Sequence, residues 1–352
     1  MPSCSFRKRR FMKTAKYSFF ILSMVSLCLL VVSWTYTPNG RLDIKIAILL
    51  KYMSVMKIDL FEEGRSVQQV RAFSDESSCI LHSAAVPVKQ INDRTLPGPS
   101  GPVPIRVYAD KEERGLPIVI YCHGGGWMMG SVDTHDNTCR SIAKKAGVIV
   151  IAPDYGLAPE KPYPKGLDDV YATLVWGWKN ATELGGDPQK IFIAGDSAGG
   201  NLAAATAIRA RDSQGPPLAG QILIYPALNL NEFNTGSYSM FSDGYYLTRR
   251  YMEKFRACYV PNPVDRLSPM VSPLLAPDLK NLPPAFIVTA QFDVLRDEGN
   301  DYAHRLKKNG IMVNMVEVKG VIHGFLKMDG VLSQANEIIA DIALFIGNVV
   351  SK

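Results

Sequence analysis

A serine in the motif GxSxG, Gly195–Gly199, has the setting of a catalytic nucleophile. Ser197 lies between the apolar stretch "IFIA" and the helix-forming stretch "NLAAATAIRARD". A sharp strand-to-helix turn would expose its hydroxyl at a helix N-terminus, where negative charge is favoured. Serine is a poor nucleophile at its ordinary pKa, so it needs a base, and the base needs a carboxylate to orient it. The motif alone is equally compatible with an ordinary glycine-rich turn.

A base and a carboxylate follow the serine in the sequence. In "TAQFDVLRDEG", Asp293 comes just after an apolar strand pattern, and in "VKGVIHGF" His323 comes just after the next one. Asp297 and Glu298 are rival carboxylates, but we expect them in the first turn of a helix, where the dipole stabilises acids. The order Ser, Asp, His is that of an α/β-hydrolase, in which the loops at the carboxyl ends of the strands gather.

A glycine-rich stretch, "VIYCHGGGWMMGS", supplies a third element for acyl chemistry. Attack on an ester carbonyl places negative charge on oxygen, and removing one donor aimed at that oxygen costs about 3 to 4 kcal/mol. His123, Gly124, Gly125 and Gly126 follow a predicted strand, and glycines allow backbone N–H groups to face inward. The stretch lacks the lysine and the spacing of a phosphate-binding P-loop.

The elements that would position these residues alternate between strand and helix. Near-continuous apolar strands separated by amphipathic helices favour a mostly parallel sheet covered on both faces. The residues 97–104 read as a hairpin turn, and 229–263 as an inserted cap, since this stretch is too long for a plain connection. Strands are predicted at 118–121, 148–151, 191–194, 221–225, 285–289 and 313–318, and helices near 138–146, 167–179, 198–211, 297–309 and 334–346. The predicted organisation is a signal or anchor segment (1–36), N-terminal cap helices (37–78) and a catalytic domain (79–352).

Charge and cysteine usage exclude several functional classes. Six of the 39 Lys and Arg residues lie in the first sixteen positions, which leaves 33 basic against 33 acidic residues. We therefore expect no nucleic-acid partner. The six cysteines are too scattered for a disulfide framework or a metal site, and Cys122 is predicted to be a buried free thiol.

An uncharged apolar run, Tyr17–Trp34, follows the basic N-terminus. Its 18 residues lie at the lower limit for a membrane-spanning helix. One interpretation is an uncleaved anchor with its basic end in the cytosol and the catalytic domain outside it. The other is a cleaved signal peptide that leads to a secreted or periplasmic protein. A buried core helix fits poorly with the one-sided basic flank.

Taken together, the motifs resemble those of the hormone-sensitive lipase family of α/β-hydrolases, serine carboxylesterases marked by HGGG. The resemblance covers about residues 80–350 and rests on "HGGGW", "DYGLAPEKPYP", "GDSAGGNLAA", "DVLRDEG" and "HGF". It implies that Ser197 is the nucleophile, His323 the base and acid, and Asp293 its orienting partner. It departs from the family at Gly156, where arginine is usual, so a structural tie of that loop is lost or replaced.

The resemblance also implies an oxyanion hole and a compact, capped pocket. The hole would be formed by N–H groups of Gly124, Gly125, Gly126 and Ala198, with His123 organising the loop. Short or medium acyl esters would be the substrates, and no metal or cofactor is needed. Apolar candidates to line the pocket, each equally compatible with core packing, are Trp127, Met128, Phe233, Tyr245 and Tyr246.

Two other functions are compatible with the same motifs. An amide hydrolase would differ only in the leaving group, and a non-catalytic receptor of the same fold would be expected to lack the base. The N-terminal layout is similar to that of the membrane-anchored arylacetamide deacetylases of the family, and exported bacterial esterases match it equally well. The sequence does not indicate an oligomeric state.

Overall fold

The structure is a computed structural model that describes residue 20, residues 23–26 and residues 28–351. The chain divides into two compact units, which meet in sequence between Ile58 and Asp59. The helix α3 (Val67–Leu81) therefore belongs to the second unit, although the sequence analysis grouped it with the residues before it.

The described part of the first unit contains helical residues at 23–26 and 28–33, a two-stranded hairpin and the helix α2 (Ile44–Val55). The strands β1 (Tyr36–Thr37) and β2 (Gly40–Arg41) pair antiparallel, and α2 follows. Asp43 caps α2 by accepting the Lys45 N–H at 2.8 Å. Among the residues that the structure describes, no helix combines the length and the apolar character needed to cross a bilayer. Six residues of the apolar run 17–34 lie outside the described residues.

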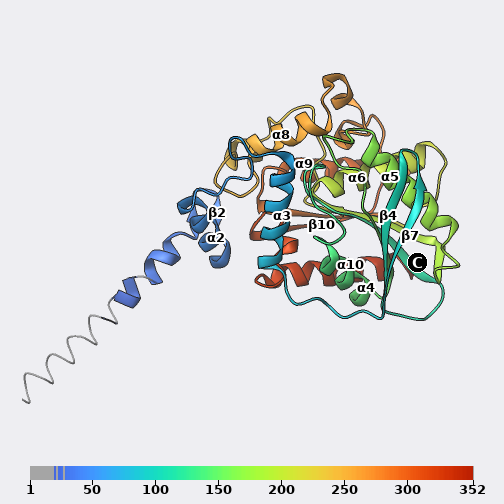
Figure 1. Ribbon diagram of the computed structural model, residues 1–352, viewed down its shortest axis with the longest axis horizontal. Coiled ribbons are helices and arrows are strands. Elements are labelled where there is room, and N and C mark those ends of the chain that lie inside the picture. The colour runs from blue at the N-terminus through green and yellow to red at the C-terminus, as the bar shows by residue number, and fades with distance from the viewer. Residues whose placement is uncertain (1–19, 21–22, 27, 352) are drawn as a thin grey trace, which may run out of the picture. The chain divides into compact units, whose positions relative to one another are not determined.

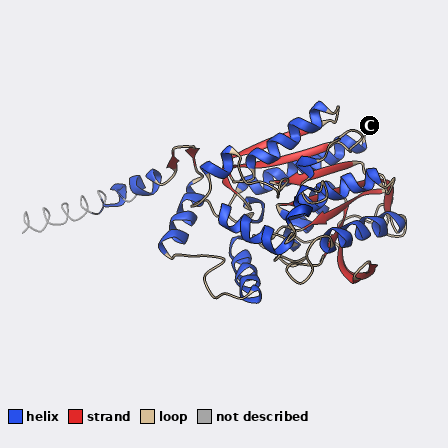
Figure 2. Cartoon of the chain, turned by 90° about the horizontal axis from the view of Figure 1, so that it is seen from above, coloured by secondary structure: helices blue, strands red, loops and turns tan. Residues whose placement is uncertain are grey.

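The second unit is an eight-stranded sheet with helices on both faces (Figures 1 and 2). Its strand order is β10-β9-β8-β7-β5-β6-β4-β3, with parallel pairs from β10 to β6 and antiparallel pairs at β6/β4 and β4/β3. The mostly parallel fold predicted from the apolar strand patterns is confirmed. The strands are β3 (Gln90–Gly98), β4 (Gly101–Ala109), β5 (Leu116–Cys122), β6 (Ile149–Pro153), β7 (Gly186–Asp196), β8 (Gly220–Ile224), β9 (Ala285–Phe292) and β10 (Val313–Ile322).

The helices form two layers, one on each face of the sheet. On one face α4 and α10 pack together, as Figure 1 shows, and on the other α5 contacts α6. The insertion 229–263 contains α7 and α8, and its role as a cap stays a prediction. The remaining helices are α4 (Asp136–Ala146), α5 (Lys165–Lys179), α6 (Ala198–Asp212), α7 (Gly236–Met240), α8 (Arg249–Tyr259), α9 (Arg296–Lys308) and α10 (Ser333–Val350), with short 3₁₀ turns η1 (Pro263–Leu267), η2 (Pro273–Leu275) and η3 (Phe325–Lys327).

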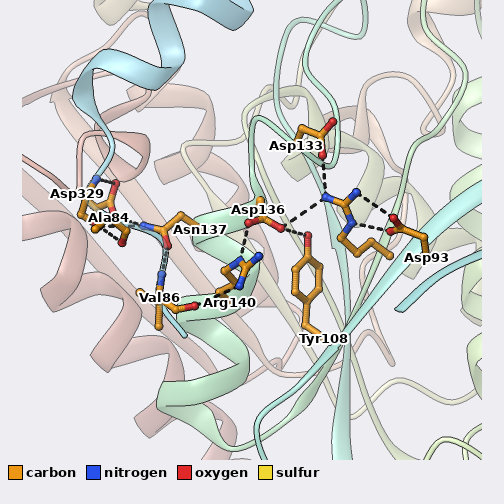
Figure 3. Close-up of polar contacts among 11 residues, drawn as sticks. Ala84, Val86, Asp93, Tyr108, Asp133, Asp136, Asn137, Arg140 and Asp329 are labelled. Carbon is orange, nitrogen blue, oxygen red and sulfur yellow. Dashed lines mark hydrogen bonds and ion pairs between the residues drawn. The ribbon is translucent and has the colours of Figure 1, made fainter. Parts of the chain in front are cut away.

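Polar contacts fix the start of α4 against β4 (Figure 3). Asp136 accepts the Tyr108 hydroxyl at 2.9 Å and is paired with Arg140. Arg106 donates to Asp93 at 2.6 Å and to Asp133 at 2.7 Å. These contacts link the edge strands β3 and β4 to the start of α4, while the central strands β5, β6 and β8 are almost wholly buried.

The register of the parallel strands decides which loops meet at their carboxyl ends. In the β5/β7 pair Cys122 is opposite Gly195, so the chain leaves both strands at the same level. In the β9/β10 pair Phe292 is opposite Ile322, which places the next residues, Asp293 and His323, side by side. Cys122 itself is buried and unpaired, as predicted.

Candidate active site

Ser197 occupies the turn between β7 and α6 with φ 57° and ψ −119°, a left-handed conformation that is strained for serine. Its N–H donates to Ile224 O at 2.9 Å, which fixes the turn to the neighbouring strand β8. A Cβ on Gly199 would lie 2.0 Å from Cys122 O, and one on Gly195 would lie 2.3 Å from Gly199 O. The flanking glycines are required because main-chain atoms pass at these distances.

His323 and Asp293 complete a continuous chain of hydrogen bonds to the serine. The His323 Nε2 atom lies 2.8 Å from Ser197 Oγ, and its Nδ1 atom lies 2.6 Å from Asp293 Oδ2. A carboxylate accepts only, so Nδ1 carries the proton and Nε2 is free to accept the serine hydroxyl proton. Asp293 is buried, and its Oδ1 atom accepts the Leu295 N–H at 2.9 Å. The structure therefore brings together the three residues that the sequence placed far apart.

The rival carboxylates Asp297 and Glu298 point elsewhere. Asp297 accepts the Ser237 N–H at 2.7 Å and pairs with Arg296. Glu298 is buried, accepts the Asn229 N–H at 3.0 Å, and has its pKa raised well above the usual value by burial. Both lie in the first turn of α9, as expected.

The glycine-rich loop presents free donors beside the serine. The N–H groups of Gly125, Gly126 and Ala198 donate to no acceptor among the residues that the structure describes. The two loop glycines have φ values of 122° and 60°, conformations that side chains disfavour. The Gly124 N–H, which the sequence analysis counted among the donors, already donates to Asp196 Oδ1 at 3.0 Å. Three predicted donors thus remain available, and the fourth holds the loop in place.

The carboxylate of Asp196, the residue before the serine, contacts several groups of the site, and the sequence did not predict it as a site residue. Its buried carboxylate accepts the Tyr121 hydroxyl at 2.9 Å and lies 3.2 Å from His135 Nε2. Burial raises the pKa of Asp196, but attraction to His135 and hydrogen bonds outweigh this effect and hold the pKa well below its usual range. The only sequence signal was the position of Asp196 inside the motif that carries Ser197.

His123 keeps the loop folded and stays neutral. Its Nδ1–H donates to Gly124 O at 2.8 Å, and its ring stacks on Tyr155 with centroids 4.2 Å apart. The Tyr155 hydroxyl donates to His123 O at 2.8 Å. Burial and the neighbouring His135 lower the pKa of His123 to about 3, so this imidazole does not exchange protons near neutral pH.

The predicted pocket residues have different surroundings. Trp127 is buried and stacks on Tyr259 at 4.8 Å. Met128 is buried as well. Phe233 stacks on Tyr238 at 4.8 Å, and Tyr245 stacks on Phe292 at 5.6 Å.

Two aromatic residues of the cap approach the catalytic loops directly. Tyr246 is 40% exposed, and its ring lies 3.5 Å from the place of a Cβ on Gly324, the residue after His323. Phe255, on α8, packs against Gly126, since a Cβ there would meet the Phe255 ring at 2.4 to 2.6 Å. The sequence analysis did not single out Phe255, because nothing in its sequence neighbourhood distinguishes it from other core aromatics.

Gly156, where the family usually has arginine, is tied to the body through its backbone. Its N–H donates to Asp169 Oδ2 at 2.9 Å. The Lys161 side chain fills the space beside it, with Cδ 2.4 Å from the place of a Cβ. The loop at Gly156 is therefore held by a main-chain hydrogen bond and by packing of the lysine stem.

Comparison with known proteins agrees with this arrangement. Residues 119–327 match a family described as having the alpha/beta hydrolase fold. The chain is 44% identical over 258 residues to the carboxylesterase NlhH of Mycobacterium tuberculosis, an alignment that covers 72% of this chain and 80% of the relative. It is 34% identical to an ethyl acetate hydrolase of Pseudomonas putida, over 80% of this chain and 93% of that protein.

A solved structure gives the same result. The hyperthermophilic esterase from Pyrobaculum calidifontis superposes with a TM-score of 0.81 at 42% identity and covers 87% of this chain and 98% of that one. The chain therefore belongs to this α/β-hydrolase family, and its resemblance to the hormone-sensitive lipase group is confirmed.

Proposed function

We propose that this chain hydrolyses short to medium acyl esters through a Ser197–His323–Asp293 triad and an acyl-enzyme intermediate. The chain is a carboxylic ester hydrolase of the family to which its relatives belong. One observation carries the proposed route: an unbroken hydrogen-bond chain from Asp293 to Ser197 lies next to three N–H groups without acceptors among the described residues.

The proposed reaction has two halves, and in each half His323 acts first as base and then as acid. His323 Nε2 takes the proton of Ser197 as Oγ attacks the ester carbonyl, and Asp293 stabilises the resulting imidazolium. The N–H groups of Gly125, Gly126 and Ala198 bind the oxyanion, aided by the positive end of α6. The alcohol leaves with the proton from His323. Water, deprotonated by His323, then attacks the acyl-serine, and the bond from the acyl carbon to Ser197 Oγ breaks as His323 returns the proton to Oγ, which releases the acid and free Ser197.

The substrate class rests on the relatives and on the cap. The Pseudomonas putida relative is named for the hydrolysis of ethyl acetate, a small ester. Phe255 approaches Gly126 and Tyr246 approaches Gly324, so bulky aromatic rings lie beside the two loops that would meet the acyl group. Trp127, Met128, Phe233 and Tyr245 remain proposed lining residues.

The test is a series of p-nitrophenyl esters and the matching anilides, from acetyl to dodecanoyl, with the full chain. We expect turnover to be highest from acetyl to hexanoyl and anilides to be slower. Ser197→Ala should abolish turnover and labelling by a fluorophosphonate probe while the melting temperature is kept. Turnover by Ser197→Ala would refute the nucleophile, preference for anilides would indicate an amide hydrolase, and an unlabelled wild-type protein would indicate a receptor.

We also propose that the basic and apolar N-terminal residues anchor the chain in a membrane with the catalytic unit outside the cytosol. The support is the sequence pattern of residues 7–34. Alkaline carbonate extraction should leave the full-length protein in the membrane pellet. A released protein that begins near Trp34 would show instead that the segment is a cleaved signal.

A further inference from the structure

Arg71, on the cap helix α3, binds two loops of the hydrolase body at once. Its Nε–H donates to Met128 O at 2.7 Å, and its Nη2 donates to Ala158 O at 3.0 Å. Its two Nη atoms also bind the carboxylate of Glu160, at 3.0 and 2.6 Å. Only the planar fork of arginine can serve three groups in this way, because the ammonium of lysine is a point charge.

The hydrogen bond to Met128 O holds the glycine-rich loop that carries Gly125 and Gly126, which is called the oxyanion loop below. Most carbonyl groups of this loop are held by donors close to them in the hydrolase body. These pairs are Tyr155 Oη to His123 O, His123 Nδ1 to Gly124 O, Met129 N to Gly125 O, and Ala158 N to Trp127 O. The buried carbonyl of Met128, two residues after the free N–H of Gly126, instead receives its donor from α3.

The other end of α3 is fixed to the segment that follows the catalytic histidine (Figure 3). Asp329 accepts from Ser83 Oγ at 2.5 Å and from Asn137 Nδ2 at 2.6 Å, and lies 3.1 Å from His82 Nδ1. The Gly330 N–H donates to Leu81 O at 3.0 Å. The helix α3 is therefore bound at one end to the oxyanion loop and at the other end to the segment after His323.

We propose that Arg71 is a positioning residue for the oxyanion hole. By holding Met128 O, it fixes the loop from which Gly125 and Gly126 direct their N–H groups at the developing oxyanion. The inference rests on the proposed function, because the positions of these donors matter only if an oxyanion forms there. A displacement of about 1 Å in such a site costs about 10²-fold in rate, and loss of a donor costs about 10²- to 10³-fold in kcat.

The test compares Arg71→Met with Arg65→Met in the full chain. Arg65 is a matched control, since it also donates to two main-chain carbonyls, Asp59 O at 2.6 Å and Leu60 O at 3.1 Å, and to the Glu62 carboxylate at 2.7 Å. Its contacts all lie within residues 59–73, where it also packs on the Phe73 ring. Both variants lose an arginine of similar connectivity, but only one touches the oxyanion loop.

We expect Arg71→Met to lower kcat for p-nitrophenyl butyrate by about 10- to 100-fold, with KM within about threefold of wild type. Phosphonate inactivation should slow in parallel, because it also places charge on an oxygen in the hole. Arg65→Met should lower the melting temperature without a comparable loss of kcat. Arg71→Lys should be impaired, and methylguanidinium should partly restore Arg71→Ala.

Each result separates the two proposals. An inactive wild-type protein refutes the proposed function and this inference with it. An active wild type with Arg71→Met and Arg65→Met equal in kcat refutes the positioning role alone. If Arg71→Met does not fold, Arg71→Lys decides, and wild-type kcat in that variant refutes the role.

Discussion

The variant Gly126→Ala keeps the Gly126 N–H but displaces it, so it tests whether the position of this donor is needed for activity. The Cβ of Gly126→Ala would lie 2.4 Å from Phe255 Cδ1 and 2.5 Å from Cγ. Carbon atoms in contact are about 3.5 to 4.0 Å apart, so the loop or the ring has to move by about 1 Å. The Phe255 ring is buried and packs edge-on against Phe61 at 5.3 Å, which favours movement of the loop.

The expected loss follows from that displacement. A Gly126 N–H moved by about 1 Å no longer meets the oxyanion, which costs about 3 to 4 kcal/mol of transition-state stabilisation. This corresponds to a loss of about 10²- to 10³-fold in kcat/KM for p-nitrophenyl butyrate. Alanine at φ 60° costs a further 1 to 2 kcal/mol or so of folding stability.

The double variant Gly126→Ala/Phe255→Ala removes the clash and keeps the backbone strain. We expect it to recover at least about tenfold in kcat/KM over Gly126→Ala, measured below the melting temperature of each variant. Gly115→Ala is the control for strain alone, since Gly115 has φ 76° and its Cβ would meet nothing within 4 Å. If loss of the Phe255 ring restores no activity, or if Gly115→Ala loses as much, the steric reasoning is wrong.

Three further predictions follow from the site and its supports. Asp293→Asn should reduce kcat by about 10⁴-fold, because the His323 tautomer is no longer fixed, and circular dichroism should show an unchanged fold; wild-type kcat would remove Asp293 from the triad. Gly199→Ala should cost about 3 kcal/mol or more in a denaturant titration, since its Cβ would lie 2.0 Å from Cys122 O and main chain moves little; a stable variant would contradict this. Burial raises the pKa of Glu298, so above about pH 4.3 the unfolded chain releases a proton that the folded chain keeps, and stability falls as pH rises from there. Glu298→Gln should therefore reduce the decline in melting temperature between pH 5 and pH 8, and an unchanged decline would show that Glu298 is ionised in the fold.

The grouping of Ser197, Asp293 and His323 could be predicted from sequence because strand patterns determine where these residues meet. Ser197, Asp293 and His323 each follow an apolar run, and parallel neighbours end at the same edge of a sheet. The same reasoning predicted the sheet itself. The antiparallel pairing of β4 with β6 could not be predicted, because a hairpin pattern does not show which other strand pairs with the hairpin.

The direction of the loop donors could not be predicted. Gly124, Gly125 and Gly126 are identical in type, but only the last two have positive φ values, and the N–H of the first meets Asp196. Arg71 lies in a polar helix, where a cation usually faces solvent, and its partners Met128 and Ala158 are far away in sequence. Such contacts depend on packing between distant segments.

The carboxylate of Asp196 has a consequence for the engineering of this protein. It adjoins Ser197 in the chain and accepts the Gly124 N–H, so it helps to set the spacing between Ser197 Oγ and the glycine-rich loop. That spacing is inherited from the core and is independent of the bound ester. Substrate range can therefore be redesigned at Tyr246, whereas changes at Phe255 on α8 would also move the loop that carries Gly126.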